Sequence, residues 1–435
     1  MGNAPDGTVT KHNDAQALLP GRALTAGATR EDRTVLVRGK GSRVWDAEGN
    51  EYIDYLLGSG PLVLGHAHPA VVEAVCKQAE LGSTFYALND RALELAATIA
   101  DLVPCAEAVQ FCGSGGEATH YALRLARAAT GRDAVLKFDG GFHGFNDYGM
   151  MSLFPQAPPR TPYPEPSSAG VPRALELEVF VSPFNDLDAV SGILAEHHTR
   201  IAAIIVEPVQ RAVAPVPGFL EGLRDLTRRY GIVLIFDEVV TGFRLAPGGA
   251  QAFYGVTPDL AALGKIVGGG YPLAAVVGRT DILGLSAPGS PADGFVFING
   301  TLNGNPVAAA AGLAAIRALD EDAYSRLHWL GTTLRDEIEQ SLLSGGIASQ
   351  VIGVGPLFQI CITASDRELH DYRATREVDS ATMSAINESV FHDGIFISGG
   401  RGYISLAHSD ADIAATSAAL AEAASEVASA TESAG

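Results

Sequence analysis

Short apolar runs alternate with longer amphipathic segments through the middle of the chain. The runs that we expect to form buried strands are residues 109–111, 134–138, 201–206, 232–236 and 274–277. The segments between them, such as 117–129 and 220–230, have the periodicity of helices. Strands that are apolar along their whole length and are separated by helices predict a parallel sheet covered on both faces.

The two ends of the chain have a different pattern. Residues 43–55 alternate around a turn at Glu48-Gly49-Asn50, which predicts a hairpin, and residues from about 345 onward mix short strands with helices. We therefore expect a smaller α+β domain built from residues 1–58 and 316–435, beside a large domain at 59–315. Seven prolines between 151 and 175 predict a long loop, either a lid or a surface excursion without a role.

Composition narrows the class of protein. A formal net charge of −20 excludes nucleic acid and anionic membrane surfaces as expected partners. The apolar runs are too short to span a bilayer, and the first twenty residues show no signal peptide. The four cysteines have no metal-ligand spacing and are too few for a disulfide framework. We expect a cytoplasmic globular protein without a metal.

A glycine-rich segment, Cys112-Gly113-Ser114-Gly115-Gly116-Glu117, follows one predicted strand and opens a predicted helix. Glycine lets the backbone approach a ligand, and a helix N-terminus offers unpaired N–H groups. The segment predicts a phosphate-binding turn, with a purely structural turn as the alternative. Its glycine spacing is not that of the dinucleotide fingerprint.

Two more candidates lie downstream. The strand at 232–236 runs into Asp237 and Glu238, at the end that faces the ligand crevice in doubly wound folds. An acid there could bind a metal, act as a base, pair with a cationic ring nitrogen or cap the next segment. Lys265 lies in an apolar, glycine-rich run, where burial would depress its pKa and favour a nucleophilic amine. The alternative is a lysine whose ammonium reaches solvent.

The order of these three features is informative. A phosphate turn, a strand-end acid and a lysine 28 residues after Asp237 match the three partners that pyridoxal phosphate needs. These partners hold its phosphate, its ring nitrogen and its aldehyde.

The chain resembles the class III, fold-type I pyridoxal-phosphate enzymes, in the branch of glutamate-1-semialdehyde aminomutase. The resemblance covers about residues 40–320. The motifs that carry it are Trp45-Asp46-Ala47-Glu48-Gly49, Val63-Leu64-Gly65-His66-Ala67-His68-Pro69, Gly141-Phe142-His143-Gly144, Val206-Glu207-Pro208, Asp237-Glu238-Val239-Val240-Thr241-Gly242-Phe243-Arg244, the run around Lys265, and Gly300-Thr301-Leu302-Asn303-Gly304-Asn305-Pro306.

The resemblance implies an α/β fold with a large, mostly parallel seven-stranded sheet and a smaller domain from both termini. It also implies a role for particular residues. Lys265 forms a Schiff base with the cofactor, and Asp237 pairs with the pyridinium nitrogen. The other implied contacts are Phe142 and Val239 on the two ring faces, Glu207 near cofactor and substrate, Ser114, Gly115 and Gly116 on the phosphate, and Thr301 of the partner subunit on the same phosphate. His143 is expected there as a hydrogen-bonded structural histidine more than as a base.

Departures from the family pattern concern the substrate. The C-terminal arginine that binds an α-carboxylate in most class III aminotransferases is Ser405 here. The Ser-Trp-Gly element of the aminomutase is Gly58-Ser59-Gly60, and its C-terminal acid is replaced by Gly400-Arg401. Ser59, Arg401 and Arg22 are therefore the candidate substrate residues, with Arg401 as a carboxylate clamp in a new position.

These observations predict an aminotransferase that works as a homodimer with shared active sites. It would move an amino group from a small-molecule donor to a keto acid, ketone or aldehyde. An intramolecular aminomutase of the glutamate-1-semialdehyde type is the main alternative. A decarboxylase or epimerase of the same fold also stays open.

Overall fold

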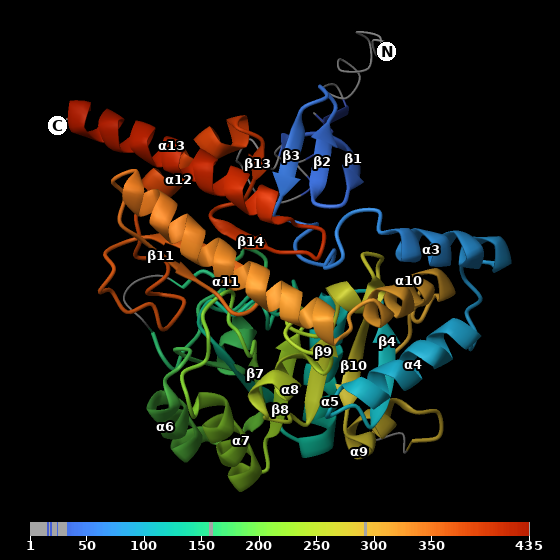
Figure 1. Ribbon diagram of the computed structural model, residues 1–435. Coiled ribbons are helices and arrows are strands. Elements are labelled where there is room, and N and C mark those ends of the chain that lie inside the picture. Colours follow the sequence, from blue (N-terminus) through green and yellow to red (C-terminus); the bar gives the residue numbers. More distant parts are fainter. Residues whose placement is uncertain are drawn as a thin grey trace.

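The computed structural model describes residues 15–16, 18–19, 24, 33–155, 160–290 and 294–434 (Figure 1). A large sheet with its helices fills the lower part of the view, and segments from both ends of the chain lie together above it. The arrangement confirms the predicted fold class.

The large sheet has seven strands. In spatial order they are β4 (Ala108–Cys112), β10 (Ala274–Gly278), β9 (Leu260–Leu263), β8 (Val233–Glu238), β7 (Ile201–Val206), β5 (Ala134–Phe138) and β6 (Val179–Ser182). Neighbours from β9 to β6 are parallel, whereas β10 runs antiparallel to both β4 and β9. The prediction of a parallel sheet was therefore wrong for β10, and β6 and β9 were not foreseen.

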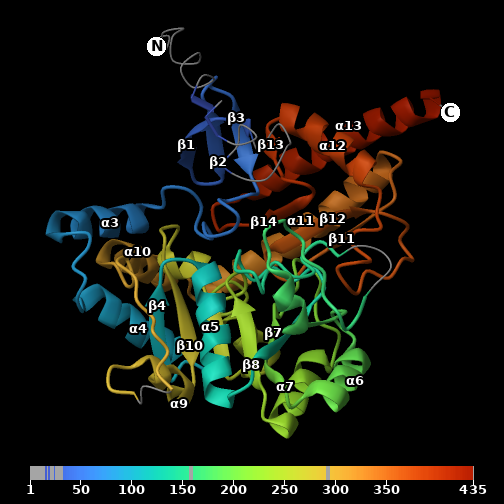
Figure 2. The same cartoon turned by 180° about the vertical axis from the view of Figure 1, so that it is seen from behind.

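Both faces of this sheet are covered by helices, as the apolar strands predicted. Alternate residues of one strand face opposite sides, so Val135 packs on one side while Leu136 packs on the other. Helix α5 (Gly115–Thr130) covers the first side, and Figure 2 shows it in front of the sheet. The helices on the other side include α4 (Asp90–Leu102), α6 (Leu187–His197), α7 (Phe219–Tyr230) and α10 (Pro306–Arg317). Because helices cover both faces of the sheet, every side chain of a central strand is buried, which explains why the strands show no alternation of apolar and polar residues.

Shorter or peripheral elements complete this part of the molecule. They are α3 (Pro69–Leu81), η2 (Arg173–Leu177), α8 (Gly249–Tyr254), η3 (Lys265–Gly268), α9 (Thr280–Leu283) and η4 (Gly284–Ser286). Helix α10 packs against α3, α4 and η3, so it links η3 to both of these helices.

The chain ends build two small sheets. One has the order β1 (Leu36–Lys40), β2 (Arg43–Asp46), β3 (Glu51–Asp54) and β13 (Ile395–Phe396). The other has β11 (Ser349–Ile352), β12 (Leu357–Ile362) and β14 (Arg401–Tyr403). Helices α11 (Glu321–Ser344) and α12 (Ser380–His392) pack on these sheets, and α13 (Asp410–Ala434) packs on both helices. The predicted hairpin is β2 and β3, and the bounds 1–58, 59–315 and 316–435 stay a prediction.

The proline-rich segment 151–175 has little regular structure in its described part. An isolated bridge joins Met151 to Pro166, and η2 begins at Arg173; residues 156–159 lie outside the described residues. Its role as a lid stays a prediction. Within the described ranges no helix is long and apolar enough to cross a membrane, and no group of three metal-binding side chains is present.

Candidate active site

The predicted phosphate turn lies between β4 and α5. Ser114 is the N-cap of α5 and accepts a hydrogen bond from the Glu117 amide at 3.3 Å, while the Gly113 amide donates to Glu117 Oε2 at 2.7 Å. This reciprocal pair fixes the first turn of the helix. The amides of Gly115 and Gly116 open the helix, where the dipole favours an anion.

The glycines around this turn allow three segments to meet. A Cβ on Gly115 would lie 2.8 Å from Val239 Cγ1, and one on Gly264 would lie 3.0 Å from the same atom. Gly144 has a φ of +82°, and its Cβ would lie 2.4 Å from the Cα of Gly116. Larger residues would push α5, Val239 and the loop after β5 apart, so the glycines form a cradle suited to a phosphate.

Asp237 lies near the end of β8 and is buried. Its Oδ1 accepts from the Val239 amide at 3.1 Å, and its Oδ2 lies 2.8 Å from His143 Nδ1. Burial raises the pKa of Asp237 to about 7 and lowers that of His143 to about 3, so the histidine is neutral and donates to the acid. Among the described residues Asp237 makes no ion pair with lysine or arginine. A cationic ring nitrogen would supply that missing partner.

Lys265 is the first residue of η3 and has a φ of 51°, in the left-handed region that non-glycine residues seldom adopt. Its ammonium donates to the Ser59 carbonyl oxygen and lies 3.5 Å from Ser59 Oγ. Burial lowers the pKa of Lys265, and the positive charge of Arg244 adds to the shift. The structure thus places Lys265 beside Ser59, as an amine that loses its proton more readily than a solvated lysine.

The remaining ring-contact candidates are held by the loops after β5 and β7. The Phe142 amide donates to Glu207 Oε1 at 2.9 Å, and the Arg211 amide donates to Glu207 Oε2 at 3.0 Å. Glu207 therefore orders the two loops. Val239 packs against Gly115 and Gly264.

The substrate candidates have different outcomes. Arg401 lies at the start of β14, after the turn that sequence analysis assigned to it, and its buried Nε has no hydrogen-bond partner among the described residues. Its Nη2 lies 3.5 Å from Gln359 Oε1. Arg22 lies outside the described residues. Thr301 is exposed, between β10 and α10.

Sequence reasoning missed Tyr403 and Arg211 near the site, and it named Arg244 only as part of a motif. Tyr403 follows Arg401 by two positions on β14, which puts both on one face of the strand. Burial raises the pKa of Tyr403, but the charges of Lys265, Arg244 and Arg401 outweigh it and leave the pKa lowered. Arg211 lies over the Phe142 ring at 5.5 Å, and buried Arg244 lies over the Tyr403 ring at 5.0 Å. In the sequence, only the two-residue spacing from Arg401 along a strand could have indicated that Tyr403 faces the same side.

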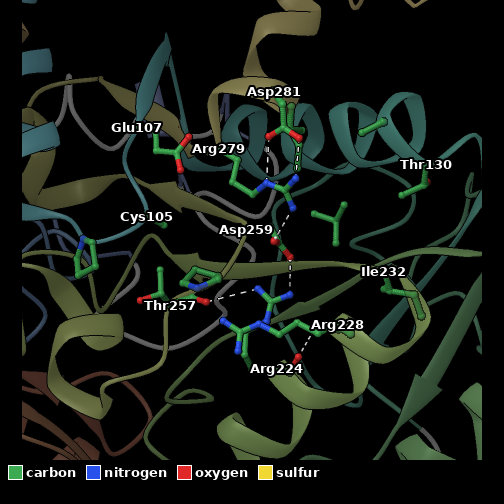
Figure 3. A pocket seen from close by; sticks show the side chains of 17 residues that line it. Cys105, Glu107, Thr130, Arg224, Arg228, Ile232, Thr257, Asp259, Arg279 and Asp281 are labelled. Atoms are coloured by element: carbon green, nitrogen blue, oxygen red, sulfur yellow. Dashed lines mark hydrogen bonds and ion pairs between the residues drawn. The ribbon is translucent and has the colours of Figure 1, made fainter.

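A separate cavity of about 530 Å³ lies at the opposite end of the sheet (Figure 3). Asp259 stands at its centre and accepts from Arg224 Nη2 at 2.8 Å, Arg279 Nη1 at 3.1 Å and the Leu234 amide at 2.8 Å. Figure 3 shows the two arginines reaching Asp259 from opposite sides. None of the predicted site residues lines this cavity. The hydrogen bonds of Asp259 join the start of β8 to Arg224 and Arg279, so we interpret the network as structural.

Comparisons with known proteins agree with this geometry. The family model for class III aminotransferases matches residues 26–398, and the chain belongs to this family. It is 41% identical to a glutamate-1-semialdehyde 2,1-aminomutase of Chloroflexus aggregans over 94% of this chain and 95% of that protein.

Solved structures are similar over nearly the whole chain. An omega-transaminase from Sphaerobacter thermophilus is 35% identical with a TM-score of 0.92, covering 98% of this chain and 99% of that one. A transaminase with pyridoxal phosphate bound is 27% identical with a TM-score of 0.87, covering 98% and 99%. Pyridoxal phosphate is accordingly the cofactor of this chain. The glycine cradle fits it, as does Asp237, which makes no ion pair with lysine or arginine among the described residues.

Proposed function

We propose that this protein moves amino groups on a carboxylate-bearing substrate, with pyridoxal phosphate held by Lys265. The observation that supports this most is the buried Asp237 carboxyl group, which has neutral His143 as a neighbour and, among the residues that the structure describes, no ion pair with a lysine or arginine. Such a group is costly unless a bound cation faces it.

Each residue has a definite task in this proposal. Bound pyridoxal phosphate supplies an electron sink for the electron pair left when a substrate carbon loses its proton. The amides of Gly115 and Gly116 hold the phosphate, and ionised Asp237 keeps the ring nitrogen protonated. When the substrate amine displaces Lys265, the freed Nζ would take the proton from the substrate carbon beside the nitrogen and pass it to the carbon on the other side of that nitrogen. Its lowered pKa suits that task.

The curated relative favours an intramolecular aminomutase, which the sequence offered as an alternative, over the intermolecular aminotransferase. The identity of 41% extends over almost the full length of both chains. In this first candidate function the same molecule gives and receives the amino group, as the name glutamate-1-semialdehyde 2,1-aminomutase says of that relative. No separate acceptor would be needed.

Arg401 supports aminotransfer as a second candidate function. It brings a cation to the site where the aminomutase pattern has an acid, and its buried Nε has no hydrogen-bond partner in the described part of the chain. The similarity to the omega-transaminase points the same way. The aminotransferase proposal includes a homodimer with shared sites and a cytoplasmic location.

A paired assay separates the candidates. Purified holoenzyme is given glutamate-1-semialdehyde alone, and in parallel a panel of amino acids and amines with and without pyruvate or 2-oxoglutarate. Isomerisation without an acceptor supports the mutase, and amine loss that requires a keto acid supports the transferase. Lys265→Ala should abolish either activity. Carbon dioxide release or racemisation in place of both would contradict the proposal.

A further inference from the structure

A second lysine is buried beneath the candidate site. Lys137 lies in β5 with 1% of its surface exposed. Its Nζ donates to the carbonyl oxygens of Gly141 at 3.0 Å, Gly149 at 2.9 Å and Met151 at 2.5 Å. Within the described ranges it makes no ion pair with a carboxylate. A buried ammonium without a counter-ion is costly, so its three hydrogen bonds must serve a purpose.

The three acceptors bracket the loop that carries two site candidates. Phe142 and His143 follow Gly141 directly, and Gly149 and Met151 lie at the other end of the loop. The His143 carbonyl oxygen accepts from Thr119 Oγ1 at 2.7 Å and Asn146 Nδ2 at 3.0 Å. These contacts hold His143 and Asn146 within loop 141–151. Lys137 ties the two ends of the loop to each other and to β5, beside the backbone hydrogen bond from the Gly140 amide to the Ser152 carbonyl oxygen at 2.8 Å.

The bonding of an ammonium group explains why a lysine is used. An ammonium has three N–H donors, which match three converging carbonyl oxygens one to one. A neutral amide has two donors and would leave one buried carbonyl unpaired, and an apolar side chain would leave all three.

We infer that Lys137 is a positioning residue for the cofactor site, which clamps the two ends of loop 141–151 and thereby holds Phe142 and His143 against the ring and Asp237. This inference rests on the proposed function, since it assumes that the ring lies between Phe142 and Val239. The clamp itself is a property of the cofactor-free chain.

The charge of Lys137 has a separate effect on the site. The charged groups that face it are Glu207, Arg211 and Asp139, of which Asp139 pairs with Arg373 at 2.8 Å. Burial lowers the pKa of Lys137 to about 7, and its positive charge helps burial keep His143 neutral. Removing this charge should make protonation of nearby groups easier, and so raise the pH at which the cofactor's visible absorbance changes.

Two variants separate the bonds from the charge. Lys137→Met removes both, and Lys137→Gln keeps two donors without the charge and is the variant more able to fold. Lys77→Met is the matched control, because the Lys77 side chain is 72% exposed on α3 and contacts Glu73. Hydrogen exchange is measured on cofactor-free protein, and cofactor affinity and the absorbance–pH profile on loaded protein.

We expect Lys137→Met to speed exchange of the amides in 141–151 selectively and to weaken cofactor binding by on the order of tenfold, as for a lost hydrogen bond of a charged group. Lys137→Gln should change exchange less but shift the absorbance–pH profile upward. Lys77→Met should match wild type in all three measurements.

Unchanged exchange in 141–151 for both variants would overturn the clamp, as would a uniform rise throughout the chain, which marks an ordinary core residue. The exchange measurement uses neither cofactor nor substrate, so its failure is distinct from that of the amino-transfer proposal. A Lys265→Ala protein that keeps full activity would contradict the proposed function but would not affect the interpretation of the exchange measurement.

Discussion

The buried carboxyl group of Asp237 should destabilise the cofactor-free protein, because no cationic cofactor ring faces it in that state. The pKa of Asp237 is raised to about 7 from 3.8, so the folded, cofactor-free state holds a proton that the unfolded chain releases. Stability therefore falls as pH rises between about 4 and 7. Asp237→Asn removes this cost, and should stabilise cofactor-free protein more at pH 8 than at pH 5.

Thermal melts of both proteins with and without cofactor test this prediction. In the loaded enzyme the same variant should lose turnover by on the order of 10² or more, because the carboxylate stabilises charge that appears in the transition state. A stability difference independent of pH, or near-normal turnover, would contradict the role of Asp237.

Arg401 is the second residue whose environment implies a ligand. Its buried Nε has no hydrogen-bond partner among the described residues. Burial lowers the pKa of Arg401 and the charge of Arg211 adds to the shift, so a bound anion would favour the charged guanidinium. Arg401→Ala should raise KM for a carboxylate-bearing substrate by a factor equivalent to about 1.5–3 kcal/mol. Amines without a carboxylate should be converted nearly as before.

Arg317→Ala on α10 is the matched control, because Arg317 is exposed and pairs with Glu94. Steady-state kinetics on both substrate types give the answer. Equal losses on both would mean that Arg401 shapes β14, and Arg22 would be the next arginine to substitute.

At the scale of elements, the N-terminus of α5 depends on close approach. Gly115→Ala would drive its Cβ into Val239, so the helix must move away from the ring-binding residues. We expect cofactor affinity to fall by on the order of tenfold or more, since about 1.4 kcal/mol suffices for that factor. Gly192→Ala in α6 is the control, because its Cβ would meet nothing within 4 Å. That control should bind cofactor normally and melt slightly higher.

Cofactor titrations and melts of both glycine variants check the prediction. Unchanged affinity in Gly115→Ala would show that α5 does not approach the cofactor closely.

The elements also show what sequence can and cannot predict. The strands at 134–138 and 201–206 were predicted to the residue, because burial on both faces leaves an unbroken apolar run. Strand β9, Leu260–Leu263, was missed because four apolar residues carry no period. The reversed direction of β10 is set by its connection and leaves no mark in its composition.

The candidate site divides in the same way. Lys265 and Asp237 were predicted from local pattern, since a lysine among glycines and an acid at a strand end are unusual by themselves, and their roles stay predictions. Arg211 and Tyr403 were missed because their importance comes from tertiary packing. They reach the site from a loop after β7 and from β14, which lie nearly 200 residues apart.

At the scale of the whole molecule, a group of apolar side chains is exposed to solvent in the single chain. The exposed side chains Leu81, Tyr86 and Leu88 lie in one segment, and Phe297 and Leu302 lie in another. Asn299 Nδ2 donates to the Tyr86 hydroxyl at 2.8 Å, which joins the two segments. Clustered apolar side chains of this kind are typical of a protein interface. Thr301 stands in the second segment, exposed and beside them.

The last prediction follows from that placement. If Thr301 completes the phosphate site of a neighbouring subunit, each active site needs Lys265 from one chain and Thr301 from the other. Lys265→Ala and Thr301→Ala proteins, mixed after reversible unfolding, should form hybrids with one intact site in two. Random pairing makes half of all dimers hybrid, so about a quarter of the wild-type sites should return.

Activity of the mixture above the mean of the two parents is the expected result. A mixture of Lys265→Ala with the double variant Lys265→Ala/Thr301→Ala is the control, because no pairing of these chains unites both residues. Activity that stays at the parental mean while light scattering shows dimers would place the phosphate site within one chain. In that case each active site would work without Thr301 of the other subunit.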